Sequence, residues 1–123
     1  MTRPRPSRLL LGLLFLGAGV PHFTHTAAYE RVMPPFLPAP HELVLLSGAA
    51  EILGGAAVLT SRLRRPARWW LVALLVAIFP ANVQVALHPG LVPGVPPALL
   101  WLRLPLQGVL IAWVLQATRE PGD

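Results

Sequence analysis

Four long apolar stretches, separated by short polar or proline-rich segments, dominate the pattern of this 123-residue chain. They cover about residues 8–26, 41–60, 67–87 and 98–117. Each approaches the roughly 20 residues that a helix, rising about 1.5 Å per residue, needs to cross about 30 Å of hydrocarbon. The pattern predicts an all-α integral membrane protein, a four-helix bundle that forms a single domain over residues 1–123.

The first apolar stretch has two interpretations. Uninterrupted apolar sequence runs only from Leu9 to Val20, which is too short to span a bilayer, so a helix reaching residue 26 must include His22 and His25. The alternative is a secretory signal peptide with small residues at positions 17–19 as its cleavage site. We favour a retained first helix, because three further spans follow it.

Residues 24–41 interrupt the pattern between the first two spans. Proline lacks a backbone N–H and cannot continue a helix interior, so the second half of this segment cannot be helical. We expect a short helix from Ala27 to Val32 and then a Pro-rich turn lying at the membrane interface, with aromatic side chains at headgroup level. The four prolines are Pro34, Pro35, Pro38 and Pro40.

Composition agrees with a membrane protein and excludes several other classes. Hydrophobic residues make up 54% of the chain and charged residues only 12%, against about 25% charged residues in average soluble domains. Cysteine is absent, which excludes disulfides, thiolate nucleophiles and Cys-ligated zinc within this chain. The net charge of +5 is not accompanied by an aromatic-basic pattern or a fold signature of nucleic-acid binding, so nucleic acid is not an expected partner.

The distribution of arginine predicts the orientation of the spans. Residues 1–8 and 61–68 carry arginine clusters, whereas residues 24–41 hold a single arginine and residues 88–97 none. Cytoplasmic loops are enriched in basic residues. We therefore expect a multi-pass protein of the inner (cytoplasmic) cell membrane with both termini in the cytoplasm.

One carboxylate, Glu51, lies near the middle of the second span. A charged side chain at that depth costs about 2.5–3.5 kcal/mol on insertion scales, so a protein partner is expected. On a helix it shares a face with small residues that allow neighbouring helices to approach closely, and this face should pack against protein. The face comprises Ser47, Gly48, Glu51, Gly54 and Gly55.

Polar side chains from all four predicted spans fall in the outer half of the membrane, while the cytoplasmic halves are nearly all apolar. Arg103 is the one cation inside a span, and we expect it to form a direct or water-mediated ion pair with Glu51, unless it snorkels outward. The cluster is a candidate ligand-binding set. Its members are His22, Ser47, Glu51, Asn82, Gln84, Arg103 and Gln107.

Histidines suggest two further alternatives, both weaker. His22 and His88 lie at similar predicted depths, which is compatible with a bis-His haem. A zinc site from His22, His25, His41 and Glu42 is also conceivable, but their spacing matches no standard zinc motif. We therefore predict no metal site.

Five short motifs, in order along the chain, resemble those of the small DoxX-like membrane proteins. They are Gly-Val-Pro-His-Phe at 19–23, Met-Pro-Pro-Phe-Leu-Pro at 33–38, Ser-Gly-Ala-Ala-Glu-Ile-Leu-Gly-Gly at 47–55, Pro-Ala-Asn-Val at 80–83 and Arg-Leu-Pro-Leu-Gln at 103–107. The resemblance implies a four-helix membrane bundle and, for some members, association with membrane oxidoreductase complexes. It assigns no catalytic residue.

Together these features predict an accessory or quinone-interacting subunit of a membrane redox system. The chain itself holds no recognisable cofactor site; a quinone is the candidate ligand, and the lipid bilayer and oxidoreductase subunits are the candidate partners. Carboxylates and imidazoles suit proton transfer, so Glu51 or His22 would handle a proton. The alternatives are a structural or assembly protein without catalytic activity and a small-solute or proton pathway.

Overall fold

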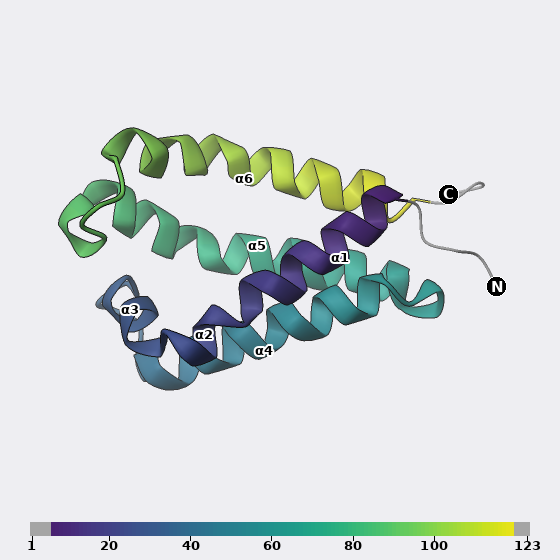
Figure 1. Ribbon diagram of the computed structural model, residues 1–123, viewed down its shortest axis with the longest axis horizontal. Coiled ribbons are helices and arrows are strands. Elements are labelled where there is room, and N and C mark those ends of the chain that lie inside the picture. The colour runs from purple at the N-terminus through teal and green to yellow at the C-terminus, as the bar shows by residue number, and fades with distance from the viewer. Residues whose placement is uncertain (1–5, 120–123) are drawn as a thin grey trace.

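The computed structural model describes residues 6–119, and the regular structure in that range is entirely helical (Figure 1). Four of its helical segments are long and apolar enough to cross a membrane: Pro6–Thr24, Pro40–Val58, Ser61–Leu87 and Pro97–Ala117. These four segments coincide closely with the four predicted spans. They support a multi-pass membrane protein.

The described part of the chain contains six α-helices and two single turns of 3₁₀ helix. In order they are α1 (Pro6–Gly19), α2 (Pro21–Thr24), α3 (Thr26–Arg31), α4 (Pro40–Val58), η1 (Ser61–Leu63), α5 (Arg64–Leu87), η2 (Pro89–Leu91) and α6 (Pro97–Ala117). The first candidate span contains both α1 and α2.

Proline positions explain several of these boundaries. Pro21 begins α2 directly after the end of α1, and Pro40 begins α4 after Ala39, which adopts a left-handed backbone conformation with φ +50°. Proline is favoured in the first turn of a helix, where its missing N–H would have had no partner. The short helix expected at 27–32 is confirmed as α3, shifted by one residue. The segment between α3 and α4 holds no regular helix, as its prolines predicted.

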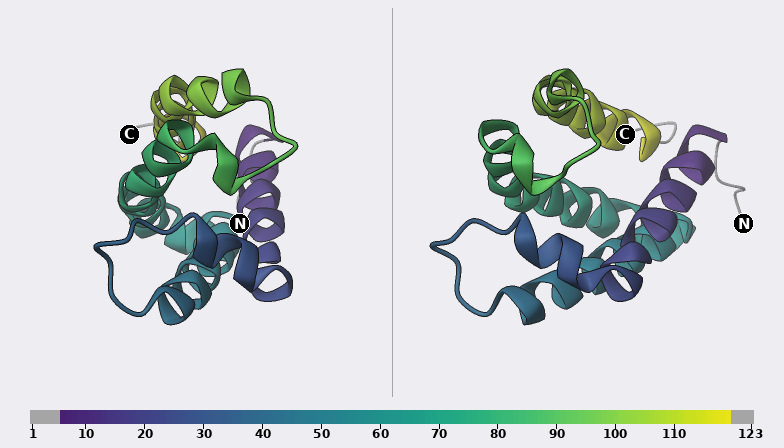
Figure 2. Two further views of the ribbon diagram at one scale, coloured as in Figure 1. Left: turned by 90° about the vertical axis from the view of Figure 1, so that its left-hand side faces the viewer. Right: turned by 60° about the vertical axis from the view of Figure 1, so that its left-hand side comes forward.

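The long helices run in alternating directions (Figure 1). α4 packs along α1 on one side and against α5 on the other, and α6 packs mainly against α5. The start of α1, the turn η1 and the end of α6 lie at one end of the molecule, and α2, α3 and η2 lie at the other (Figures 1 and 2). α1 meets α6 at the first of these ends, where the indole of Trp113 donates to Ser7 Oγ over 2.8 Å.

The contact between α1 and α4 is close because glycines face each other across it. A Cβ atom added to Gly55 would lie 2.7 Å from the carbonyl oxygen of Gly12, and one added to Gly48 would lie 2.5 Å from Cβ of His22. Neither position has room for a side chain. The predicted packing face of the second span is thus confirmed, since Gly48, Glu51, Gly54 and Gly55 are all buried.

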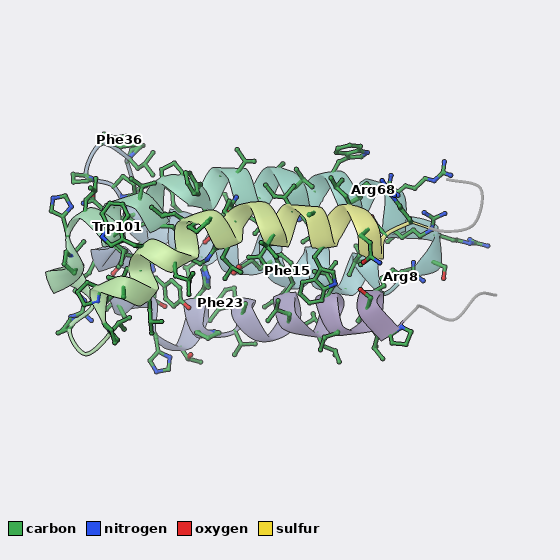
Figure 3. All side chains as sticks on the ribbon, turned by 90° about the horizontal axis from the view of Figure 1, so that it is seen from above. Arg8, Phe15, Phe23, Phe36, Arg68 and Trp101 are labelled. Carbon is green, nitrogen blue, oxygen red and sulfur yellow. The ribbon has the colours of Figure 1, made fainter. Side chains whose placement is uncertain are left out.

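The end where α1 begins and α6 ends is also the basic end, and the apolar core lies nearest to it. Arg8 and Arg68 lie there, with Phe15 deeper in the molecule (Figure 3). Arg68 donates through Nε to Thr118 Oγ1 (2.8 Å) and through Nη2 to the Thr118 carbonyl (3.0 Å), which places cationic charge at the negative end of the α6 dipole. The buried core includes Leu11, Phe15, Val58, Leu71, Leu75 and Val114.

Candidate functional site

The buried acid of α4 is partnered by a histidine of α2. Oε2 of Glu51 lies 2.8 Å from Nε2 of His22, and both residues are less than a tenth exposed. The two side chains meet because Gly48, one turn before Glu51, lets α2 approach the α4 backbone. The distance is that of an ion pair, but Glu51 Oε2 accepts no hydrogen bond of good geometry. The two side chains therefore form a close pair in which Glu51 Oε2 can still accept a hydrogen bond.

The other nitrogen of the imidazole is anchored to α4. Nδ1 of His22 lies 3.1 Å from the carbonyl oxygen of Val44 and 3.0 Å from Ser47 Oγ, and the serine hydroxyl itself donates to the same carbonyl over 2.9 Å. A carbonyl oxygen can only accept, so Nδ1 carries a hydrogen and donates it. The other ring nitrogen, Nε2, then faces Glu51 Oε2 at 2.8 Å. This arrangement suits reversible proton exchange.

Tyr29 of α3 completes the site, and sequence reasoning had placed it only at the membrane interface. Its ring stacks on the His22 imidazole with the centroids 4.1 Å apart and the planes inclined by 29°. Burial, and secondarily the charge of Glu51, raises the pKa of the Tyr29 phenol, which therefore stays protonated at neutral pH. The available signal was that Tyr29 is the single tyrosine and lies on the short helix directly after His22.

A cavity of about 210 Å³ opens onto this group of residues between α2, α3, α4 and α5. Two of the residues that line it each hold a buried side-chain atom without a hydrogen-bond partner, namely the acceptor Glu51 Oε2 and the donor Asn82 Nδ2. Buried polar groups are nearly always hydrogen-bonded, so an unsatisfied acceptor and donor among the residues of one cavity make this cavity the candidate site. The polar lining comprises His22, Tyr29, Ser47, Glu51 and Asn82, and the rest is apolar.

The expected ion pair between Glu51 and Arg103 is wrong. Nη1 of Arg103 instead donates to Gln107 Oε1 over 3.3 Å, and Gln107 Nε2 donates to the carbonyl oxygen of Leu75 on α5 over 2.6 Å. The reason is the packing order: α6 packs mainly on α5 and is not a main neighbour of α4, which packs against α1, α2, α3 and α5. Gln107 thus ties α6 to α5, Arg103 is held by Gln107 within α6, and neither residue lines the cavity.

Gln84 also lies outside the cavity. It follows Asn82 by two residues on α5, which turns its side chain about 200° away. Its backbone carbonyl accepts from the N–H and from Nδ1 of His88, at 3.0 and 3.1 Å. Of the seven candidate residues, the structure therefore brings four together, namely His22, Ser47, Glu51 and Asn82.

The two metal alternatives do not assemble within residues 6–119. No group of three or more His, Asp or Glu side chains in this range is placed to hold a metal ion. His41 contacts Glu30 (Nδ1 to Oε1, 2.9 Å) and His25 contacts Thr24, so neither joins His22. The ring nitrogens of His22 already face Glu51, Val44 and Ser47, which leaves no nitrogen for an axial haem bond.

Comparison with known proteins corrects the family resemblance. No curated protein and no solved structure shows detectable similarity to the chain. The family whose model matches, over residues 11–118, is not a DoxX family. The five motifs were unspecific because glycine, alanine and proline around single polar residues serve helix packing and helix ends in any small polytopic protein. The chain belongs to the family described as Domain of unknown function (DUF8561).

Proposed function

We propose that this protein binds a small, uncharged ring bearing hydroxyl or carbonyl oxygens, of the quinol–quinone class, in the cavity between α2 and α5. The observation that carries the proposal is the pair of unsatisfied atoms, Glu51 Oε2 and Asn82 Nδ2, on one polar cavity. A hydroxyl group donates to the first and accepts from the second. The stacked rings of His22 and Tyr29 offer an adjoining aromatic surface.

The charges around the cavity favour a neutral ligand. His22 lies 2.8 Å from Glu51, the acidic side chain that lines the cavity, and offsets its charge. Arg103, which would have favoured an anionic ligand, is engaged with Gln107 elsewhere. The pair can take a proton from a bound hydroxyl, or return one, while electron transfer falls to partner subunits of a membrane redox system.

We further propose that the four spans form a bundle in the cytoplasmic membrane with both termini in the cytoplasm. The arginines Arg8, Arg62, Arg65 and Arg68 lie near the starts of two of the spans, at the end where α1 begins and α6 ends. Basic residues favour the cytoplasmic side. In this orientation the cavity lies in the outer half of the membrane, and the apolar core separates it from the cytoplasm.

Single-cysteine labelling tests this orientation, because the natural chain holds no cysteine. We expect Val95→Cys, in the exposed loop before α6, to react with a membrane-impermeant maleimide in intact cells. Arg62→Cys, at the basic turn η1, should react only after the membrane is permeabilised. The reverse labelling pattern would show that the orientation is inverted.

Ligand binding tests the site itself. We expect the purified protein in detergent to bind methylhydroquinone, and Asn82→Leu to weaken binding about tenfold, because the leucine removes the amide donor at similar volume. Gln84→Leu is the matched control: it makes the same change on the same helix, outside the cavity. Isothermal titration calorimetry measures both. Equal affinities for the two variants, or no binding to the unmodified protein, would refute the proposal.

One observation favours a purely structural role as the alternative. The hydrogen bonds from His22 to Val44 and Ser47 fasten α2 to α4 whether or not a ligand is present. A structural clasp predicts that Asn82→Leu leaves the protein as stable as before and that methylhydroquinone does not raise its melting temperature. The titration above therefore separates the two functions.

A further inference from the structure

A second cavity, an apolar groove, opens between α4 and α5. It has a volume of about 600 Å³, and apart from Ser47 its lining is apolar. This volume falls in the range of about 300–1,000 Å³ that is usual for ligand sites, whereas the polar cavity alone, at about 210 Å³, is below that range. The polar cavity therefore holds no more than part of a ligand of ordinary size.

The groove exists because small residues face each other across it. Ala73, Ala77 and Ala81 recur every four residues and so follow one face of α5, opposite Ala49 and Ala50 of α4. Alanines cannot fill the space between two helices. Larger side chains form the walls of the groove, among them Leu46, Leu53, Trp70, Leu74 and Ile78.

The ends of the groove differ. Towards the basic end it is bounded by Trp70, whose indole nitrogen donates to the carbonyl oxygen of Ala50 over 2.9 Å. At the other end it adjoins the polar cavity, and four residues line both spaces: Met33, Ser47, Ile78 and Ala81. Methionine is flexible and unbranched, so Met33 can adjust at the junction.

We infer that the two spaces form one site, which takes a lipid with a single hydrocarbon tail and a hydroxyl-bearing ring as its head. The inference rests on the proposed function for the head and adds the tail. The ring lies in the polar cavity near Glu51 and Asn82, and the tail lies in the groove along Ala81, Ala77 and Ala73.

The dimensions and exposure agree with a tail that enters sideways from the bilayer. Ala81 follows Trp70 by eleven residues on α5, which corresponds to a groove length of about 16 Å at about 1.5 Å per residue. Ala73 and Ala77 are exposed on the surface of the span, so a tail reaches them from the surrounding lipid without passing through water. The adjoining polar cavity, which is lined by the buried, incompletely hydrogen-bonded Glu51, distinguishes this groove from a surface that merely contacts bulk lipid chains.

The test compares two probes, methylhydroquinone and decylhydroquinone, on four proteins: the unmodified chain, Ala77→Phe, Val76→Phe and Asn82→Leu. In the unmodified protein the decyl probe should bind about tenfold more tightly, because its tail adds buried apolar area. Ala77→Phe fills the groove and should abolish this advantage while leaving the affinity for the methyl probe unchanged. Val76→Phe is the control, because Val76 is 57% exposed, adjacent in sequence and outside the groove. Tail partitioning into detergent is the same for all four proteins and cancels in the comparison.

The outcomes separate the tail site in the groove from the head site in the polar cavity. If the methyl probe binds but the tail advantage survives Ala77→Phe or is equally lost in Val76→Phe, the tail site is refuted and the proposed head site stands. If Ala77→Phe weakens the decyl probe but Asn82→Leu does not, the tail site is supported and the proposed head site is refuted. Loss of the advantage in Ala77→Phe, together with weaker binding of both probes to Asn82→Leu, supports the whole site.

Discussion

Replacing His22 with alanine is expected to lower the free energy of unfolding by about 3–5 kcal/mol, the usual cost of removing one partner of a buried pair. The variant leaves the carboxyl group of Glu51 without its 2.8 Å neighbour and removes the bonds from Nδ1 to Val44 and Ser47. Chemical unfolding in detergent micelles measures the loss. His25→Ala is the control, because the His25 ring is exposed and contacts only Thr24, so its loss should be small.

A double-mutant cycle separates the pair from its surroundings. We expect His22→Ala and Glu51→Gln together to cost clearly less than the sum of the two single variants, because each single change strands the other partner. The same cycle with Arg103→Gln and Glu51→Gln should be additive, since Arg103 pairs with Gln107 instead. Additivity in the first cycle, or strong coupling in the second, would contradict the arrangement of the polar side chains described above.

Replacing Gly55 with leucine should disrupt the α1–α4 contact and reduce the amount of folded protein recovered from membranes. The new Cβ would lie 2.7 Å from the carbonyl oxygen of Gly12 and 2.9 Å from the backbone nitrogen of Leu16. Both neighbours are backbone atoms of α1, which cannot yield as a flexible side chain can. Inserting bulk into a well-packed contact costs about 1–3 kcal/mol, and a leucine facing a helix backbone should exceed that range.

Gly17→Leu is the matched control for this change. Gly17 lies on α1, and an added Cβ meets nothing within 4 Å. Leucine also has a higher helix propensity than glycine, so this variant should be as stable as the unmodified protein or slightly more stable. Melting temperatures and the yield of folded protein from membranes measure both variants. Similar values for Gly55→Leu and Gly17→Leu would contradict the close approach of α1 and α4.

Several features of the fold were predictable because their causes are local. Apolar length determines which segments are long enough to span a bilayer, and proline determines where helices begin, as at Pro21, Pro40 and Pro97. The face of α4 that carries Glu51 was also predictable, because helical periodicity places the small residues Gly48 and Gly55 beside it. A buried acid among glycines requires protein contacts whatever the neighbour is.

The sequence by itself thus determined the four apolar helices, their arginine-rich end, and the fact that Glu51 is buried among close-packed glycines. Only the tertiary structure decided that its partner is His22 and not Arg103, because this depends on which helices pack against α4. It also decided that Tyr29 stacks on His22 and that the alanines of α5 border a groove. Periodicity gives each helix its faces, but the pairing of faces arises from the packing of all the helices at once.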